Sequence, residues 1–256
     1  MNKRLLCVCA LALAAAPCFG AGPSWDGTWK LNEAKSKMTG STVTITQNGN
    51  MYTVDSGTFK FSFACDGKDY NVLPDRTISC SGSGNSYTLV EKVNGTLYAT
   101  IKRQISADGN TLTDVTTGKR PDGTAFTDHE TDTRVGGGSG MAGTWKATAV
   151  KNSAPGVFIL KVNGDVLHYE NPGYKETSDA KLDGTPAPIM GPDAPAGLTV
   201  SNKSDAPNKV TTVVYLNGKE LGRDVMTLSA DGKMITDVSW TPGKESEKQT
   251  YVYDRQ

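Results

Sequence analysis

The sequence predicts an all-β protein made of two similar domains, each folded as an antiparallel meander of short strands. Two observations carry this prediction. Runs of alternating polar and apolar residues are separated by glycine-containing turns along most of the chain, as in half-buried antiparallel strands. A set of short motifs also occurs twice in the same order, about one domain length apart.

The repeat is anchored by the tetrapeptide Gly-Thr-Trp-Lys, which occupies residues 27–30 and again residues 143–146. Further matches follow in order: Asn48-Gly49 with Asn163-Gly164, Asp66-Gly67 with Asp183-Gly184, Asn94-Gly95 with Asn217-Gly218, residues 106–109 with 229–232, residues 113–115 with 236–238, and Arg134 with Arg255. One insertion in the proline-rich run 186–195 explains the single change of offset. The chain is therefore predicted to be a tandem pair of domains.

The strands can be located from alternation and from turn residues. The clearest are residues 42–46, 58–63, 87–93 and 96–105. The last two flank Asn94-Gly95, a dipeptide that favours two-residue hairpin loops. Residues 33–38 are expected to form at most one short helical turn. Such a meander can close as a barrel or fold as a β-sandwich, and both alternatives remain open at this point.

Residues 1–20 have the features of a secretory signal peptide. Lys3 and Arg4 precede an apolar stretch that is too short to span a membrane comfortably. The small residues Cys18 and Gly20 predict cleavage by a signal peptidase after Gly20. A lipid anchor on Cys18 is the alternative, and Pro17 before it disfavours that interpretation. The mature protein is thus expected in the periplasm or outside the cell, without a transmembrane span.

Charge and cysteine content restrict the partners and the redox chemistry. The chain has 27 basic and 27 acidic residues, and loss of Lys3 and Arg4 leaves a net charge of about −2, so nucleic acid is not an expected partner. Cys65 and Cys80 remain after cleavage, and an even pair in an oxidising compartment predicts one disulfide. A redox-active pair is disfavoured because the spacing is not Cys-x-x-Cys.

The predicted domain boundaries follow from the repeat. The first domain covers residues 21–134, a Gly/Ser linker covers 135–140, and the second domain covers 141–256. Glycine and serine lose much entropy on ordering, so the linker is expected to be flexible. The two domains are expected to fold independently.

A Gly-x-Trp motif on the first strand and an arginine on the last strand occur once in each copy. This pattern resembles the lipocalin-like (calycin) β-barrels. The resemblance implies that the tryptophan sits at the closed end of each barrel with the arginine packed across it, as a cation–π pair. On this basis Trp29 is expected to pair with Arg134, and Trp145 with Arg255.

One local group of charged residues suggests a binding site. Asp128, Glu130 and Asp132 alternate with Arg134, so all four side chains share one face of a strand. If that face points inward, Glu130 and Asp132 line a cavity for a cation or a polar ligand. The favoured alternative is a charged strand edge that resists aggregation, because unpaired buried acids are unfavourable.

The second copy carries different residues at the matching positions, namely Gln249, Tyr251, Tyr253 and Arg255. Tyr251 and Tyr253 are therefore the candidate ligand-binding residues of an aromatic pocket. The run 186–195 is interpreted either as a lid over that pocket or as a plain surface loop.

The sequence contains no motif for catalysis. His129 and His168 do not match between the copies, and zinc-ligand spacings, a Gly-x-Ser-x-Gly elbow and a phosphate-binding loop are not found. No catalytic residue, metal or cofactor is predicted. The expected function is an exported envelope protein that binds a small apolar or amphipathic ligand in one or both cavities. The alternative is a protein-binding module, such as a protease inhibitor or surface interaction protein; an enzyme has the least support.

Overall fold

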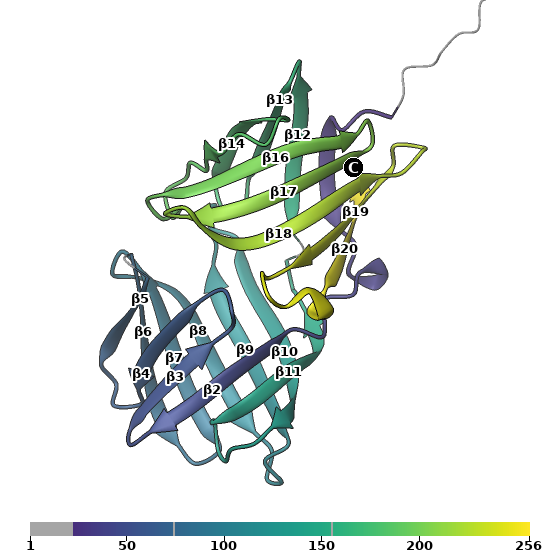
Figure 1. Cartoon of the computed structure of the whole chain (residues 1–256). Helices are drawn as coiled ribbons and strands as arrows, with labels where there is room; N and C mark the ends of the chain where they lie inside the picture. The colour runs from purple at the N-terminus through teal and green to yellow at the C-terminus, as the bar shows by residue number, and fades with distance from the viewer. Residues whose placement is uncertain (1–22, 74, 155) are drawn as a thin grey trace, which may run out of the picture.

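The computed structural model describes residues 23–73, 75–154 and 156–256 (Figure 1). The described chain forms two ten-stranded antiparallel sheets, each curled into a nearly closed barrel, so the predicted all-β fold is confirmed. The predicted signal peptide, residues 1–20, lies outside the described residues. Within them, no helix is long and apolar enough to cross a membrane.

One barrel is formed by an uninterrupted part of the sequence, and we call it the inserted barrel. Its strands are β2 (Thr42–Asn48), β3 (Met51–Asp55), β4 (Lys60–Ala64), β5 (Asp69–Leu73), β6 (Arg76–Ser83), β7 (Ser86–Val93), β8 (Thr96–Ile105), β9 (Thr111–Lys119), β10 (Ala125–Gly136) and β11 (Gly143–Lys151).

The other barrel takes strands from both sides of this insertion, and we call it the split barrel. Its strands are β1 (Gly27–Leu31), β12 (Val157–Asn163), β13 (Val166–Asn171), β14 (Glu176–Lys181), β15 (Ala187–Pro188), β16 (Leu198–Ala206), β17 (Lys209–Leu216), β18 (Lys219–Leu228), β19 (Met234–Trp240) and β20 (Gln249–Arg255). Two single 3-10 turns, η1 (Glu33–Lys35) and η2 (Glu245–Glu247), complete the described elements.

The two Gly-Thr-Trp-Lys strands are exchanged relative to the order of the repeats. β1 lies between β12 and β20 of the split barrel, whereas β11 lies between β2 and β10 of the inserted barrel. The structure thus places the boundary elsewhere than the predicted 135–140: Val135 and Gly136 belong to β10, and residues 137–142 turn into β11 within one barrel. Because both copies have the same four residues, the local sequence does not tell which barrel each strand completes.

The tryptophan–arginine pairs are present, but with the opposite partners to those expected. Trp29 and Trp145 are both fully buried. The guanidinium carbon of Arg255 lies 4.4 Å from the ring centroid of Trp29, and that of Arg134 lies 4.1 Å from Trp145. The predicted pairs Trp29–Arg134 and Trp145–Arg255 are therefore wrong, because the strand exchange brings each tryptophan to the other arginine.

The seam of the inserted barrel lies between β4 and β5, which end its sheet. A disulfide between Cys65, just after β4, and Cys80 on β6 spans this seam, so the predicted disulfide is confirmed. The split barrel closes with backbone hydrogen bonds instead. Thr177 and Met190 exchange two bonds of 2.8 Å, and the Ser204 amide donates to the Leu182 carbonyl at 2.9 Å.

Removal of the disulfide, by the double variant Cys65→Ala and Cys80→Ala, is expected to destabilise the inserted barrel by about 3 kcal/mol, the value for a loop of this size. The split barrel should keep its stability, because its seam holds no disulfide. Hydrogen exchange resolved by strand measures both barrels in one sample. Equal loss of protection in β6–β8 and β16–β18, or no loss in either, would contradict the proposed local role.

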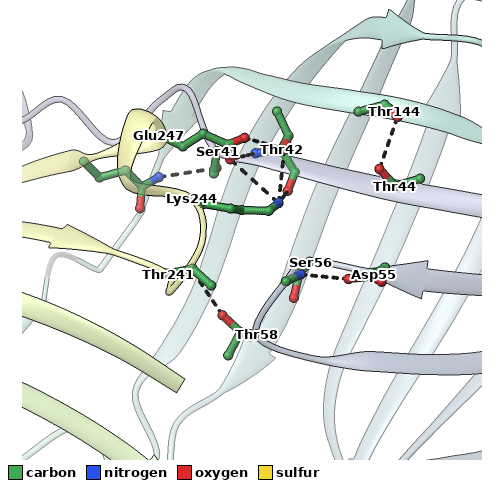
Figure 2. Close-up of polar contacts among 12 residues, drawn as sticks. Ser41, Thr42, Thr44, Asp55, Ser56, Thr58, Thr144, Thr241, Lys244 and Glu247 are labelled. Carbon is green, nitrogen blue, oxygen red and sulfur yellow. Dashed lines mark hydrogen bonds and ion pairs between the residues drawn. The ribbon is translucent and has the colours of Figure 1, made fainter. Parts of the chain in front are cut away.

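The two barrels lie end to end (Figure 1). Each contributes its open end, away from its tryptophan: the Asp122 amide in the turn after β9 donates to the Gly173 carbonyl in the turn after β13, at 3.3 Å. In the turn after β9, the Arg120 guanidinium carbon lies 5.6 Å from the ring centroid of Tyr174, in the turn after β13. Figure 2 shows a second contact, in which Lys244 Nζ donates to the Thr42 carbonyl at 2.6 Å and Glu247 accepts from the Thr42 amide at 2.8 Å. Polar contacts therefore join the open ends of the barrels.

Candidate functional site

The split barrel encloses a cavity of about 240 Å³. Its apolar wall is formed by Phe158, Leu160, Leu167, Ile189, Val200, Val214 and Met226. Two tyrosines extend this wall: the ring centroid of Phe158 lies 5.8 Å from that of Tyr169 and 4.7 Å from that of Tyr253. The cavity can thus hold an apolar or aromatic group.

A polar wall crosses four neighbouring strands, β16 to β19. Asn202 pairs in register with Thr212, and Thr212 pairs with Asp224 on the next strand. Asp237 on β19 completes this wall of the cavity. Asn202 and Thr212 are only 3% and 8% exposed, although such residue types are mostly found at protein surfaces.

None of the described residues that line the cavity is basic. An opposing charge lies on Arg76 of the inserted barrel, and it partly offsets the rise that burial causes in the pKa of Glu176. Burial raises the pKa of Asp237 to about 7. Burial and the neighbouring Asp237 carboxyl raise the pKa of Asp224 well above its usual value, and burial raises that of Glu176. Burial in the cavity therefore disfavours the charged form of these carboxyl groups, and Asp237 is about half protonated near pH 7.

The tyrosines predicted from the sequence lie on one face of β20, but only one reaches the cavity. Tyr253 is part of its wall, and burial raises the pKa of its hydroxyl group, so it acts as a neutral group. Tyr251 lies nearer the inserted barrel, and its hydroxyl donates to Gln249 Oε1 at 2.8 Å. The segment proposed as a lid contributes β15 to the sheet and Ile189 to the wall.

In the inserted barrel, Glu130 and Asp132 share the inner side of β10 with Arg134. β10 pairs with both β9 and β11, so the favoured interpretation as a charged sheet edge does not hold. Burial, followed by repulsion from neighbouring carboxylates, raises the pKa of Asp132 to about 6 and that of Glu130 to about 7. Asp132 is buried, whereas Glu130 still reaches solvent at the open end. Asp128 accepts from the Ser153 amide at 2.9 Å instead.

Sequence reasoning missed the partner of these acids. Arg103 on β8 donates through Nε and one terminal nitrogen to both carboxylate oxygens of Asp114 on β9, at 2.9 and 2.6 Å. The signal was present, because Ile101-x-Arg103-x-Ile105 places an arginine on an apolar strand face. Asp114 and Asp237 also belonged to a recognised repeat match, but no role was assigned to either.

The repeat explains why one barrel is hollow. In the inserted barrel, β4 places Phe63 opposite Tyr52 and Phe61 opposite Val54. The corresponding pairs in the split barrel are Ala180 opposite Leu167 and Ser178 opposite Tyr169. Two phenyl rings that pack in the core of the inserted barrel are thus replaced by small side chains. Because side chains fill protein interiors densely, this loss of volume leaves the cavity.

Comparison with protein families and curated sequences identifies no relative of this chain. No protein-family model matches the chain, and no curated protein sequence matches it.

Proposed function

We propose that the protein binds a small molecule in the cavity of the split barrel. The observation that carries this proposal is the lining itself: an apolar and aromatic wall faces a buried polar wall, as is common in small-molecule sites. The inserted barrel, in whose core Phe63 and Trp145 are fully buried, then stands at the open end of the binding barrel.

We also propose that both barrels are divergent members of the lipocalin-like family and that the protein works in the periplasm or outside the cell. The buried tryptophan–arginine pair in each barrel supports the first statement. The signal-like residues 1–20 and the disulfide support the second.

The alternative functions have less support. The large apolar side chains exposed in the described part of the chain are Leu97, Val135 and Met190, which lie on three separate segments rather than in a patch. A protein-binding module therefore has no docking surface in its favour. Thr212 lies beside Asp224 in the polar wall, but burial raises the pKa of Asp224 well above its usual value, which disfavours the carboxylate that a general base requires. An enzyme therefore remains the weakest hypothesis.

The proposal is tested by extracting natively purified protein with organic solvent and identifying the released molecule by mass spectrometry. Ser178→Phe, which restores a ring at the position of Phe61, is expected to fill the cavity and abolish the bound molecule. Ser178→Ala is the control, since it removes the hydroxyl without adding volume. Wild-type protein without a stoichiometric ligand, or a ligand that remains in Ser178→Phe, would refute the proposal.

A further inference from the structure

The two barrels differ in charge at several matched positions, and one of these pairs lies beside the cavity. In the inserted barrel Arg103 pairs in register with Asp114, and the two side chains form the double hydrogen bond described above. In the split barrel the corresponding pair is Met226 and Asp237. The acid is kept and its cation is replaced by an uncharged side chain.

A second set of matched positions differs in the same direction. Across β6, β7 and β8 the inserted barrel carries the apolar row Cys80, Leu89 and Ile101. The split barrel carries the polar row Asn202, Thr212 and Asp224 in its place. Compared with the inserted barrel, the split barrel has no arginine beside Asp237 and has a further acid, Asp224, on the next strand. It carries Tyr251 and Tyr253 at the positions that match Glu130 and Asp132.

An unpartnered polar atom gives independent support for a ligand group. One carboxyl oxygen of Asp237, a residue that lines the cavity, is buried and has no hydrogen-bond partner within the described part of the chain. Thr212 is more than nine-tenths buried in the same wall, and its hydroxyl group lowers the pKa of the neighbouring Asp224 carboxyl. Buried polar groups are nearly always hydrogen-bonded, so the unpartnered oxygen of Asp237 indicates a donor supplied from outside the chain.

From these observations we infer that the ligand is an organic cation, whose ammonium or guanidinium group is held by Asp224 and Asp237. The inference rests on the proposed ligand-binding function and names its chemical class. The cationic group takes the place that the Arg103 guanidinium occupies in the inserted barrel. The apolar part of the ligand packs against Phe158, Leu160 and Leu167.

Other ligand classes fit this lining less well. An anion would meet only acids among the charged residues of the wall. A divalent metal ion such as Ca²⁺ requires about six or more oxygen ligands, whereas most of this wall is apolar or aromatic. An organic cation suits both surfaces, because aromatic faces attract ammonium and guanidinium groups.

Binding should depend on pH through the acids that face the cation. The titratable groups around Asp237 are Asp224 on β18, Tyr251 and Tyr253 on β20, Tyr169 on β13 and Glu176 on β14. The tyrosine hydroxyls stay neutral because their pKa values are raised. Burial raises the pKa of Asp237 to about 7, so the affinity for a protonated amine should rise as the pH increases through this value and should fall below it.

The test uses the whole folded protein, stripped of extractable molecules, in isothermal titration calorimetry. The probes are 2-phenylethylamine and butylamine, each compared with the alcohol of the same skeleton. At pH 8 the amines are expected to bind at least roughly tenfold more tightly than the alcohols. Asp237→Asn should remove this preference, and Met226→Arg should abolish amine binding by placing a guanidinium inside the cavity.

A matched control separates charge from folding. Asp179→Asn makes the same acid-to-amide change on an exposed side chain outside the cavity. This variant should retain the amine preference, and circular dichroism confirms that each variant is folded. Equal binding of amines and alcohols, or binding of neither amine, would overturn the cation inference. A neutral endogenous ligand that is absent from Ser178→Phe would also overturn the cation inference, but it would support the proposed binding function.

Discussion

Trp145→Ala is expected to destabilise the inserted barrel by about 3–5 kcal/mol and to leave the split barrel nearly unchanged, while Trp29→Ala does the reverse. Each side chain is fully buried, so truncation removes a large apolar surface and leaves a cavity. Each indole nitrogen also donates to a backbone carbonyl, at 3.1 Å from Trp29 to Trp25 and at 3.0 Å from Trp145 to Met141. Strand-resolved hydrogen exchange assigns the loss to one barrel.

A double-mutant cycle then identifies the partner of each tryptophan. Trp145 should couple to Arg134, and Trp29 to Arg255, by about 0.5 kcal/mol or more, as contacting residues do. Trp240→Ala serves as the control, because Trp240 is only partly buried and belongs to neither tryptophan–arginine pair. Its ring centroid lies 4.3 Å from Lys248 Nζ. Coupling of Trp145 to Arg255 would mean that the strands are not exchanged in solution.

The second large effect concerns fragments of the chain. A fragment of residues 37–152 is expected to fold alone, because it contains all ten strands of the inserted barrel, its disulfide and Trp145. A fragment of residues 21–134, cut where the repeat suggests, lacks β11 and leaves β2 and β10 without their shared neighbour. Circular dichroism and cooperative denaturant unfolding should show that residues 37–152 are more stable than residues 21–134.

The fragment of residues 21–134 also tests the exchange of strands, because it contains β1, which has the same four residues as the start of β11. We expect β1 to occupy the empty position in residues 21–134 and to place Trp29 beside Arg134. Trp29→Ala should therefore unfold this fragment, although in the whole chain it affects only the split barrel. An unfolded 37–152 fragment would show that the inserted barrel depends on its neighbour.

Local sequence was enough to predict the strands and several turns. Asn94 and Asn217 adopt positive φ angles of 50° and 51°, and the glycines that follow them have 77° and 78°, as the two-residue hairpin requires. The disulfide followed from compartment and count alone. These features depend on a few neighbouring residues, so a single sequence contains the necessary information.

The exchange of strands and the binding cavity depend on pairing across the chain. Gly-Thr-Trp-Lys is the same in both copies, so no local preference distinguishes Arg134 from Arg255 as a partner. Asp237 likewise has no local signature of a site. The register of the strands is needed to recognise it as part of a site. In the split barrel Asp237 pairs with Met226, whereas in the inserted barrel the corresponding Asp114 pairs with Arg103. Glu130 and Asp132 were recognised because they form an obvious alternating run.

The sequence of the inserted barrel interrupts that of the split barrel. This arrangement sets the order in which the strands can pair with their neighbours during synthesis. β1 leaves the ribosome first, yet β20, one of its two neighbours, leaves last among the strands. The inserted barrel meanwhile has an open position between β2 and β10 until β11 is made. We expect Trp29 to compete for that position, and wherever β1 has entered it, Trp145 must displace Trp29 before the split barrel can close. Early protection of β1 from hydrogen exchange in arrested chains that end before residue 143 would reveal this competition, and continuous exposure of β1 would exclude it.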